Sequence, residues 1–590
     1  MNQNLKNMHH KCDLCVVGGG LAGMCAAVAA ARHGLKVVIM QDRPMFGGNA
    51  SSEIRMWICG AHGENNRETG ILEEICLENL YRNPYRTFPI WDSILFEIVK
   101  NEKNITSLLN CSCNDCVMDG NVIKQIVGWQ TTTQCFHTVE ARFFADCSGD
   151  SILAPLSGAE YTVGREARAQ YNESIAPEVA DRKTMGLTCL IQGRQMPEKR
   201  TFIPPTWARK FKKEDLAYRL PNMNNPTENF WYMELGGTVD SIADTEELRD
   251  ELLKVAYGIW DYVKNSGECD ADNWELDFVG FLPGKRESRR YIGDYVMTQN
   301  DILAGGQFED LVAFGGWTMD DHNPEGINTT DRPNIFHPAP SPFGIPYRSL
   351  YSKNIANLFF AGRNISVTHS ALSATRVMGT CATIGQAVGT AAALAVTYDT
   401  SPRGVYESKI GELKQVLMED GCYLPGNIME PSEIMKKAII VTGGKDGELL
   451  INGHERQIGD DSNCWSGKVG DFIEIRFAQP VCAKRIRIVL DSDLERRTIG
   501  GGYLVQRATI ANVPIDLKPV HVPGTLVKDM RIEIMDKTGA YTTIAEIRGN
   551  HSLTSHTGIR ILCKASIQNR IRNRVCHLIR VTIRYTFRSK

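Results

Sequence analysis

A strand, a glycine-rich turn, a helix and a second strand follow one another near the start of the chain. The first strand is expected over residues 14–17, the helix over 21–32 and the second strand over 37–40. The turn between strand and helix has three glycines, Gly18, Gly20 and Gly23. At this spacing the first glycine makes the turn, the second lets backbone approach a pyrophosphate, and the third packs helix on strand. The unit predicts a doubly wound α/β domain with a dinucleotide at the helix N-terminus.

The end of the second strand normally carries an acidic residue that holds the ribose hydroxyls. Here Gln41 occupies that position and Asp42 follows it. A neutral amide can still hydrogen-bond a diol, so the dinucleotide assignment stands. The residues expected to contact the dinucleotide from this unit are Gly18, Gly20, Leu21, Ala22, Gly23, Gln41 and Asp42.

The length of 590 residues predicts roughly three or four domains. A second apolar strand at 357–363 precedes a small-residue helix, and the long stretch before it is too long for a loop. From about residue 430 apolar and polar residues alternate as in antiparallel strands of a β-sandwich. The expected organisation is a dinucleotide domain in two segments (1–155 and 345–400), an inserted α+β substrate domain (156–344), a helical linker (401–430) and an all-β sandwich (431–590).

Composition narrows the class of protein. A net charge of −3 argues against a general nucleic-acid binder. No apolar run approaches the roughly 18 residues of a membrane span, and no signal peptide is evident, so a cytoplasmic chain is expected. The cysteines are scattered among apolar segments, which fits a reducing compartment, and "CSCNDC" is interpreted as strand rather than metal site. The basic last forty residues favour a solvated sandwich edge over an anion-binding tail.

Three further segments indicate whether the dinucleotide is NAD or FAD. A second glycine pair, Gly47-Gly48, follows the second strand after Arg43, and Ala361-Gly362-Arg363 ends the later strand. "ADCSGD" resembles the Ala-Thr-Gly motif of the glutathione-reductase-like flavoproteins, with Ser148 and Gly149 in the matching places. Together these features resemble a two-segment FAD domain rather than a simple NAD domain.

"GGNASSEIR", "GKRESRRYIGDY" and "NLFFAGRNISVTHSALSATRVMGTCATIGQAVGTAAAL" are similar to the FAD-dependent oxidoreductase family. That family is related to the fumarate reductase flavoproteins and to the flavin part of heterodisulfide reductase, and the resemblance covers roughly residues 11–400. It implies noncovalent FAD; the iron–sulfur branch is not implied, because its cysteine clusters are missing. The further FAD contacts that it implies are Arg43, Gly47, Gly48, Asn49, Ser51, Ser52, Asp146, Ser148, Gly149, Gly362, Arg363, Arg376, Gly379 and Thr380.

The helix after Gly362 is expected to begin within Ser373–Gly379, and its positive N-terminus would stabilise negative charge on the flavin N1–C2 side. His369 is expected on the loop before this helix. If a flavin oxidises a carbon bearing a hydroxyl, a base must take the hydroxyl proton, and histidine has a suitable pKa. His369 is the first candidate for that base, and His62 is the second.

Two charged clusters are candidates for substrate binding. Glu53 and Arg55 would share one face of an extended segment, where they either meet substrate or pair with each other. "PGKRESRRY" places four basic residues around Glu287, and Arg289 is the candidate clamp for a carboxylate; a surface charge run is the alternative. "WTMDDH" adds Trp317, Asp320, Asp321 and His322, a combination that suits a polyhydroxylated ligand.

The sandwich resembles galactose-binding modules, which bind carbohydrate or only pack against a catalytic domain. The first functional hypothesis is therefore hydride transfer between flavin N5 and a small polar metabolite, such as a sugar, sugar acid or glycoside hydroxyl. Fumarate-reductase-like chemistry on a double bond beside a carboxylate is the alternative reaction. A carbohydrate-binding scaffold with structural FAD is the non-enzyme alternative. The sequence leaves the substrate, the electron acceptor and the oligomeric state open.

Overall fold

The computed structural model describes residues 5–63, 65–225, 228–442, 447–454, 456–461, 463–481, 486–492, 494, 508–522, 524, 526–535 and 538–549, with the backbone of two further strands at 560–562 and 576–586. The chain divides into two compact units. The first comprises Met1–His62, Tyr85–Leu417 and Arg507–Lys518, and the second Gly63–Pro84, Met418–Gln506 and Pro519–Lys590.

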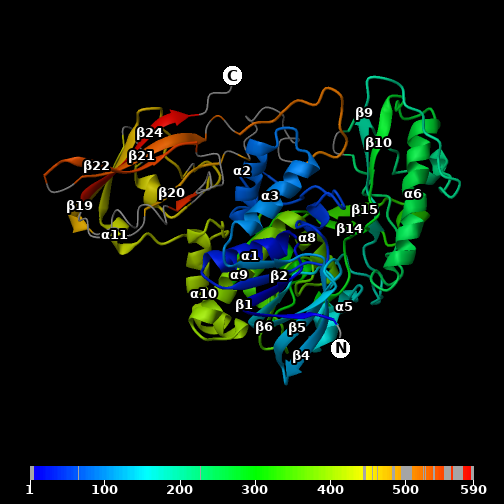
Figure 1. Cartoon of the computed structure of the whole chain (residues 1–590), viewed down its shortest axis with the longest axis horizontal. Helices are drawn as coiled ribbons and strands as arrows, with labels where there is room; N and C mark the ends of the chain where they lie inside the picture. The colour runs from blue at the N-terminus through cyan, green and yellow to red at the C-terminus, as the bar shows by residue number, and fades with distance from the viewer. Residues whose placement is uncertain are drawn as a thin grey trace. The chain divides into compact units, whose positions relative to one another are not determined.

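A parallel sheet forms the centre of the first unit (Figure 1). Its strands run in the order β3-β2-β1-β6, and β17 pairs with the other side of β6. Two antiparallel strands, β5 and β4, extend the sheet beyond β6. The strand bounds are β1 (Asn7–Val17), β2 (Val37–Met40), β3 (Ile105–Leu108), β4 (Cys111–Asp119), β5 (Val122–Gln130), β6 (Cys135–Asp146) and β17 (Leu358–Phe360). This confirms the expected α/β domain and its two-segment construction.

Helices α1 (Leu21–Arg32) and α9 (Met378–Thr397) pack against each other, although more than 300 residues separate them. Small residues allow this approach. A Cβ on Gly385 would lie 2.0 Å from the Ala22 carbonyl oxygen, and one on Gly389 would lie 2.1 Å from that of Ala26. The early and late segments of the domain are therefore held together by backbone contact between these two helices.

The region between β6 and β17 has a hydrophobic core of its own, which includes Ile191, Ile259 and Trp260. It belongs nevertheless to the same compact unit as the central sheet, so a separate inserted domain stays a prediction. Its longer elements are β9 (Ile191–Gln195), α6 (Thr245–Asn265), β10 (Trp274–Val279), β13 (Leu311–Gly315), β14 (Met319–His322), β15 (Asn334–His337) and β16 (Phe343–Pro346). Its short elements are α4 (Leu153–Ser157), β7 (Tyr161–Thr162), α5 (Arg168–Tyr171), β8 (Leu187–Thr188), β11 (Gly284–Lys285), β12 (Arg290–Tyr291) and α7 (Gln299–Leu303).

A segment from far along the chain completes this region. Residues 508–518, here called the strap, form a parallel bridge between Val513 and Arg194 beside β9. The Val513 amide donates to the Gly193 carbonyl at 3.0 Å, and the Gln195 amide donates to the Val513 carbonyl at 2.9 Å. The sequence boundary at residue 431 placed the strap in the sandwich, whereas its contacts place it in the first unit.

The rest of the first unit includes α3 (Phe88–Lys100), α8 (His369–Thr375) and α10 (Pro402–Glu419).

In the second unit, α2 (Ile71–Arg82) is grouped with the C-terminal strands, although the sequence boundaries placed it in the dinucleotide domain. That unit contains an antiparallel sheet in the order β18-β19-β24-β21-β22 and a separate pair, β20-β23. Its bounds are α11 (Glu433–Lys436), β18 (Ala438–Thr442), β19 (Phe472–Val481), β20 (Arg487–Val489), β21 (Val527–Met535), β22 (Tyr541–Ile547), β23 (Arg560–Leu562) and β24 (Cys576–Thr586).

Strand β24 corrects one expectation about the basic C-terminal stretch. It was expected at a solvated edge, but it pairs with β19 on one side and β21 on the other, in the middle of the five strands. Both sets of its backbone hydrogen-bonding groups are therefore used inside the sheet. A two-layered galactose-binding-like sandwich stays a prediction.

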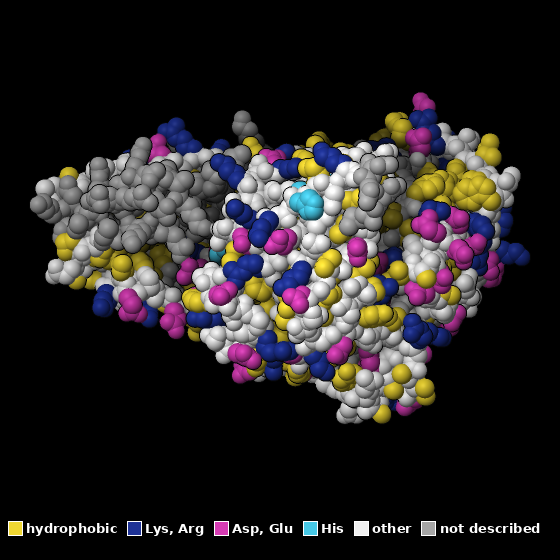
Figure 2. All heavy atoms as spheres, turned by 60° about the horizontal axis from the view of Figure 1, so that its bottom comes forward, with side chains coloured by type: hydrophobic (Ala, Val, Ile, Leu, Met, Phe, Trp, Pro, Cys, Tyr) yellow, Lys and Arg dark blue, Asp and Glu magenta, His cyan; other side chains and the backbone are white. Residues whose placement is uncertain are grey.

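Other general features can be stated for the described part of the chain. One helix, α9, is long and apolar enough to cross a membrane, but 94% of its most apolar window is buried inside the protein. The cysteines described with their side chains are free thiols, and no group of three or more His, Cys, Asp and Glu residues there is arranged to hold a metal. On the face shown in Figure 2, Lys and Arg are interspersed with Asp and Glu among the described side chains.

Candidate active site

The two glycine loops that follow β1 and β2 lie against each other. Gly20 and Gly47 form a parallel bridge, and the Gly47 amide donates to the Gly19 carbonyl at 2.8 Å. A Cβ on Gly48 would lie 3.1 Å from the Gly20 Cα, and Gly48 has a φ of +58°. Gly20 caps α1 without a side-chain hydrogen bond, so bare backbone faces the start of this helix. Such a cradle has the form that a pyrophosphate needs.

The second side of this cradle comes from β6 and β17. A Cβ on Gly149 would lie 2.6 Å from Arg363 Nη1, and Arg363 Nη2 pairs with Asp150 at 2.8 Å. Lys285 pairs with the other oxygen of Asp150, also at 2.8 Å. Burial would raise the pKa of Asp150, but Arg363 and Lys285 outweigh burial and lower it to about 2. Arg363 Nε is buried without a hydrogen-bond partner among the described residues, so this arginine retains a donor for a ligand.

Several residues expected at the dinucleotide use their side chains within the protein. Gln41 Oε1 accepts from the Gly19 amide at 2.6 Å, and Gln41 Nε2 donates to the Met45 carbonyl at 3.2 Å. Ser51 Oγ donates to the Gly48 carbonyl at 2.8 Å, and Asn49 Nδ2 donates to the Lys285 carbonyl at 3.1 Å. These side chains shape the loops; their backbone can still face a ligand.

Three more of these residues are placed as follows. Asp146 is fully buried and accepts from Tyr291 Oη at 2.6 Å and Ser148 Oγ at 2.7 Å, so its carboxylate braces the end of β6. Asp42 is largely exposed and pairs with Arg43 at 3.7 Å. The backbone amide of Ser52 donates to Asp92 at 3.1 Å and is therefore not open to a ligand.

Two consecutive helices follow Gly362 where the sequence suggested a loop and one helix. The Thr368 side chain accepts from the Ala371 amide and caps α8, so His369 is the first residue of a helix and not part of a loop. The chain breaks at Arg376 and Val377, and α9 then begins at Met378 without a side-chain cap. Thr380 is fully buried, and the Gly379 amide donates to the Cys59 carbonyl at 2.8 Å. The segment containing Cys59 thus lies at the beginning of α9.

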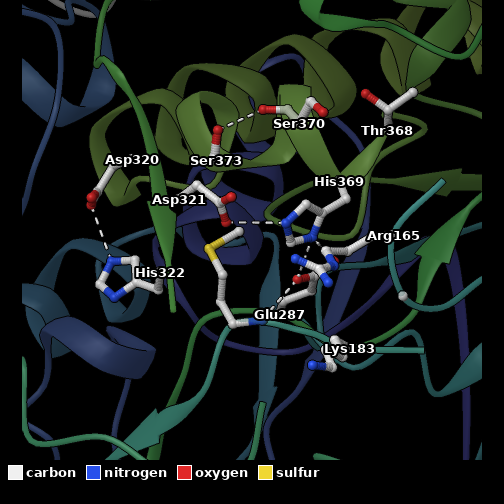
Figure 3. A network of polar contacts seen from close by, with 12 residues as sticks. Arg165, Lys183, Glu287, Asp320, Asp321, His322, Thr368, His369, Ser370 and Ser373 are labelled. Carbon is white, nitrogen blue, oxygen red and sulfur yellow. Dashed lines mark hydrogen bonds and ion pairs between the residues drawn. The ribbon is translucent and has the colours of Figure 1, made fainter. Parts of the chain in front are cut away.

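His369 is held between two carboxylates (Figure 3). Its Nδ1 lies 2.9 Å from Glu287, which is fully buried and also pairs with Arg290. Its Nε2 lies 3.2 Å from Asp321, whose side chain is 24% exposed. Glu287 also accepts from the Met185 amide at 3.0 Å. The Nδ1 side is therefore anchored in the protein interior, and Nε2 is on the more accessible side.

The electrostatics of this arrangement favour a charged imidazole. Burial by itself would lower the pKa of His369, but Glu287 and Asp321 raise it to about 10. The pKa values of both carboxyl groups are lowered despite their burial, with His369 among the causes. At neutral pH, His369 is an imidazolium that donates a hydrogen bond from each nitrogen.

A second histidine, the last residue of β14, has a matching arrangement on the opposite face of that strand from Asp321. His322 Nδ1 is 3.0 Å from Glu234, and His322 Nε2 is 3.2 Å from Asp320. Arg286 pairs with Glu234 at 2.9 Å, and Arg376 pairs with Asp320 at 3.2 Å. Burial lowers the pKa of His322, but Glu234 and Asp320 outweigh it, so the net shift is upward. This chain of alternating charges ends at Arg376, immediately before α9.

The structure separates the charged residues that the sequence analysis combined. Residues 52–54 form a turn and Arg55 has a φ of +66°, so Glu53 and Arg55 do not share the face of an extended segment. Glu53 pairs with Arg43 at 3.6 Å. Arg55 pairs with Asp277 at 3.5 Å and lies over the Phe278 ring at 4.0 Å. The two residues therefore do not pair with each other, and Arg55 braces β10.

The other two candidate residues, Arg289 and His62, make contacts different from those of His369. Arg289 Nη1 donates to the Asp150 carbonyl at 3.2 Å, and its guanidinium lies over the Tyr161 ring at 5.6 Å. His62 is exposed and stacks on Trp317, with ring centroids 4.4 Å apart. Roles for Arg289 and His62 in catalysis stay predictions.

The partners of the two histidines were not assigned from the sequence. Glu287 stands in "KRES", which had been noted as a basic cluster, and Asp320 and Asp321 stand in "MDDH", which had been considered for a polyhydroxylated ligand. Glu234 was not noted at all. Alternation along β14 could have placed Asp320 and Asp321 on opposite faces, but nothing local indicates which distant residue each one meets.

Comparison with known proteins decides the family. The model of the family described as FAD dependent oxidoreductase matches residues 13–417. The chain belongs to this family. The match covers both segments of the α/β domain, both glycine loops and both histidine pairs. A search of curated proteins found no match.

A search of solved structures found matches to this chain at low similarity. A geranylgeranyl bacteriochlorophyll reductase-like protein from Thermoplasma acidophilum is 11% identical, with 70% of this chain and 86% of that chain covered and a TM-score of 0.31. The Mycobacterium smegmatis Sdh1 complex is 11% identical over 69% and 76%, with a TM-score of 0.29. An Escherichia coli quinol fumarate reductase variant is 12% identical over 70% and 75%, with a TM-score of 0.26.

The protein is an FAD-dependent oxidoreductase, and its residues fit the cofactor. A side chain at Gly48 would crowd the Gly20 backbone, so the close approach of these two loops, which would hold the pyrophosphate, requires glycine. Three further polar atoms are buried without hydrogen-bond partners among the described residues: Arg376 Nε, Trp317 Nε1 and Thr318 Oγ1. Arg376 and the first turn of α9 would meet the flavin N1–C2 side, where positive charge stabilises the reduced ring.

Proposed function

We propose that this flavoenzyme reduces a carbon–carbon double bond conjugated to a carboxylate, with His369 as the proton donor. The observation that carries the proposal is the placement of His369 between Glu287 and Asp321. Both of its nitrogens face carboxylate oxygens, so both carry protons in the resting enzyme. Reduction of such a double bond requires a hydride at one carbon and a proton at the other.

The contacts of His369 support a separate role for each group in this reaction. When bound and reduced, FAD would supply the hydride for this chemistry. Glu287 fixes the imidazole through Nδ1 and is itself fixed by Arg290 and the Met185 amide. The Nε2 proton lies on the side of the partly exposed Asp321 and is the one available to a substrate carbon. Glu287 and Arg290 therefore orient the donor, and Nε2 delivers the proton.

A cation for the substrate carboxylate stands beside this pair. Arg165 lies close to His369 and Glu287 in Figure 3, and its pKa is raised mainly by its hydrogen bond to Asp181. Its side chain is 21% exposed, so the guanidinium is partly open to a ligand. Arg165 already donates from Nε and Nη2 to the two oxygens of Asp181, so a substrate carboxylate would meet its remaining N–H groups. Arg165 thus takes the role that the sequence analysis gave to Arg289.

Oxidation of a sugar hydroxyl, the first hypothesis from the sequence, requires a proton acceptor. The pKa of His369, about 10, means that this residue already holds its proton through neutral pH. The same site would accept a proton only at high pH or after Asp321 moves away. The charge state therefore supports the reductive direction.

The test is a pair of anaerobic flavin titrations on the FAD-loaded enzyme. Photoreduced enzyme is mixed with fumarate, crotonate and cinnamate, and oxidised enzyme is mixed with a panel of sugars and hydroxy acids. We expect an unsaturated acid to restore the oxidised flavin spectrum, and His369→Gln to slow this reoxidation by about 10²-fold or more. Bleaching of the oxidised enzyme by a sugar, with no reoxidation by any unsaturated acid, would overturn the proposal.

A further inference from the structure

Three buried carboxamides near Arg55 each have only one end engaged. Gln192, Asn229 and Asn512 are 2%, 0% and 0% exposed. Gln192 Nε2, Asn229 Oδ1 and Asn512 Nδ2 have no hydrogen-bond partner among the described residues. A buried amide group without a partner is unfavourable, because it has lost water and gained nothing in return. Three such groups in one neighbourhood point to a polar ligand.

The partners at the engaged ends fix how each carboxamide is oriented. Gln192 presents its oxygen to Arg55 Nη1 at 3.1 Å, and an arginine can only donate. Asn512 presents its oxygen to the Gly193 amide at 2.8 Å, which also can only donate. Asn229 presents its nitrogen to the Arg55 carbonyl at 3.5 Å, which can only accept. The open ends are therefore two NH₂ groups and one carbonyl oxygen.

These groups lie in one connected part of the first unit. Gln192 and Asn229 both bond to Arg55, and Asn512 bonds to Gly193, the residue after Gln192. Ala511, next to Asn512, belongs to an apolar cluster with Trp57, Cys59 and Val377. Val377 is the N-cap of α9, and Trp231 and Trp317 pack against the same cluster. The carboxamides thus border an aromatic cluster at the start of the helix where the flavin ring is expected.

We propose that Gln192, Asn229 and Asn512 form a neutral subsite that binds a hydroxylated ring of the substrate. A hydroxyl group both donates and accepts, so adjacent hydroxyls can satisfy two NH₂ groups and one carbonyl together. Flat aromatic side chains next to neutral amides complement a ring that has an apolar face and polar edges. Trp317 Nε1, also buried without a partner, adds one more donor to this side.

The inference rests on the proposed function only for the position of the reacting end. The substrate class becomes an unsaturated acid that carries a hydroxylated ring. Gln192 and Asn512 would determine specificity, since a site built to hydrogen-bond hydroxyls discriminates strongly against an analogue without them. Asn512 comes from the strap, so the C-terminal part of the chain contributes a residue to this subsite.

The experiment uses two probes that contain no reducible double bond, D-glucuronate and cyclohexanecarboxylate. Both are ring carboxylates, and only the first has hydroxyl groups. Their binding to the oxidised, FAD-loaded full chain is measured by perturbation of the flavin absorbance and by calorimetry. We expect glucuronate to bind about tenfold tighter or more. Gln192→Glu and Asn512→Asp keep the engaged oxygen and replace only the open NH₂, so each should reduce the preference for glucuronate severalfold.

The matched control is Gln195→Glu on the same strand. Gln195 Oε1 accepts from the Ile515 amide of the strap at 3.1 Å, in an exposed position. It should fold, bind FAD and leave the ratio of the two dissociation constants unchanged. FAD content and thermal midpoint are measured for each variant. A variant that fails to fold is replaced by Asn512→Ser, for which the same loss of preference is expected.

Equal affinity for the two probes, or no binding of either one, would overturn the inference, because the open amides would then hold only water. A preference that survives in Gln192→Glu and Asn512→Asp would overturn it as well. Neither probe can accept a hydride at a double bond, so these results do not depend on the proposed reaction. Failure of the flavin reoxidation by unsaturated acids, including one with a hydroxylated ring such as shikimate, with a preserved glucuronate preference, would refute the reaction alone.

Discussion

Asp320 and Asp321 are neighbours in the chain but serve different histidines. Asp320 contacts His322 and Arg376, and Asp321 contacts His369, on the opposite side of β14. Alternation of side chains along a strand produces this separation. The two aspartates therefore make a matched pair for testing which histidine controls proton transfer.

The Asp321→Asn variant should move the alkaline limit of flavin reoxidation to lower pH. Without this carboxylate, one of the two causes that raise the pKa of His369 is lost, so the imidazole loses its proton at a lower pH. The measurement is the rate of reoxidation by an unsaturated acid between pH 6 and 10. Asp320→Asn, the control, should leave that limit in place. An unchanged limit in Asp321→Asn would exclude His369 as the titrating donor.

The charge of His369 also links the stability of the fold to pH. Because the folded pKa of His369, about 10, exceeds its ordinary value of 6.5, the contact of His369 with Glu287 and Asp321 stabilises the protein fully below about pH 6.5 and loses this contribution as pH rises towards 10. Each pKa unit corresponds to about 1.4 kcal/mol, so the effect is on the order of a few kcal/mol. Urea unfolding of wild type and His369→Gln at pH 6.5 and 10 should show a difference that shrinks at the higher pH. A constant difference would contradict the linkage.

Among the elements, α1 and α9 carry the connection between the early and late segments of the FAD domain. Their contact depends on glycines rather than on interlocking side chains, since Gly385 and Gly389 bring α9 against the carbonyl groups of α1. With FAD bound, the N-terminus of α1 would meet the pyrophosphate and that of α9 the flavin. A change in the spacing of the helices should therefore reduce cofactor binding as well as stability.

Gly385→Ala should separate these helices, because its Cβ would lie 2.0 Å from the Ala22 carbonyl oxygen. Overpacking of this kind costs about 1–3 kcal/mol or more, and FAD content should fall with it. The control is Gly411→Ala in α10, where no atom lies within 4 Å of the added Cβ; it should stabilise the protein by up to about 1 kcal/mol. Thermal midpoint and bound FAD per chain are the measurements. Full FAD occupancy and unchanged stability in Gly385→Ala would contradict this account of the interface.

At the scale of the whole molecule, neither compact unit is continuous in sequence. The second unit includes Gly63–Pro84, and the first includes the strap. Within the second unit, Tyr423 bonds to Thr69 at 2.8 Å, Arg456 donates to the Arg67 carbonyl at 2.8 Å, and Ser492 Oγ donates to Glu73. The early segment with α2 therefore depends on residues more than 300 positions later.

A chain that ends after Glu419 should fold poorly, although it contains the whole family match. It lacks the strap and every C-terminal partner of Gly63–Pro84, so α2 would expose its buried leucines and isoleucines. We expect aggregation in size-exclusion chromatography and a lower thermal midpoint. Replacement of residues 63–84 in the truncated chain by a Gly-Ser linker should recover part of its solubility. A monomeric truncated protein with full FAD and the midpoint of the full chain would contradict this dependence.

The glycine turns, the end of β1, α1 and β2 were predicted closely, because their signals are local: an apolar strand, Gly18-x-Gly20-x-x-Gly23, and helix formers up to Arg32. The strand β1 begins at Asn7, earlier than the expected residue 14. The later strand at 358–360 was found the same way. The roles of Glu53 and Arg55 were less predictable, since an extended segment was assumed where Arg55 adopts a positive φ. Likewise, His369 was expected in a loop because the Thr368 cap was not recognised.

The sequence by itself determined the FAD fold and the family, because the backbone conformations that bind a dinucleotide depend on glycines at fixed local spacing. Only the tertiary structure decided the chemistry of the site. Glu287 and Asp321 lie 82 and 48 residues from His369, and Asn512 lies 319 residues from Gly193. A histidine motif alone suggests a base near neutral pH. Two distant carboxylates, brought to its two nitrogens in the buried interior, raise its pKa to about 10 and keep it protonated.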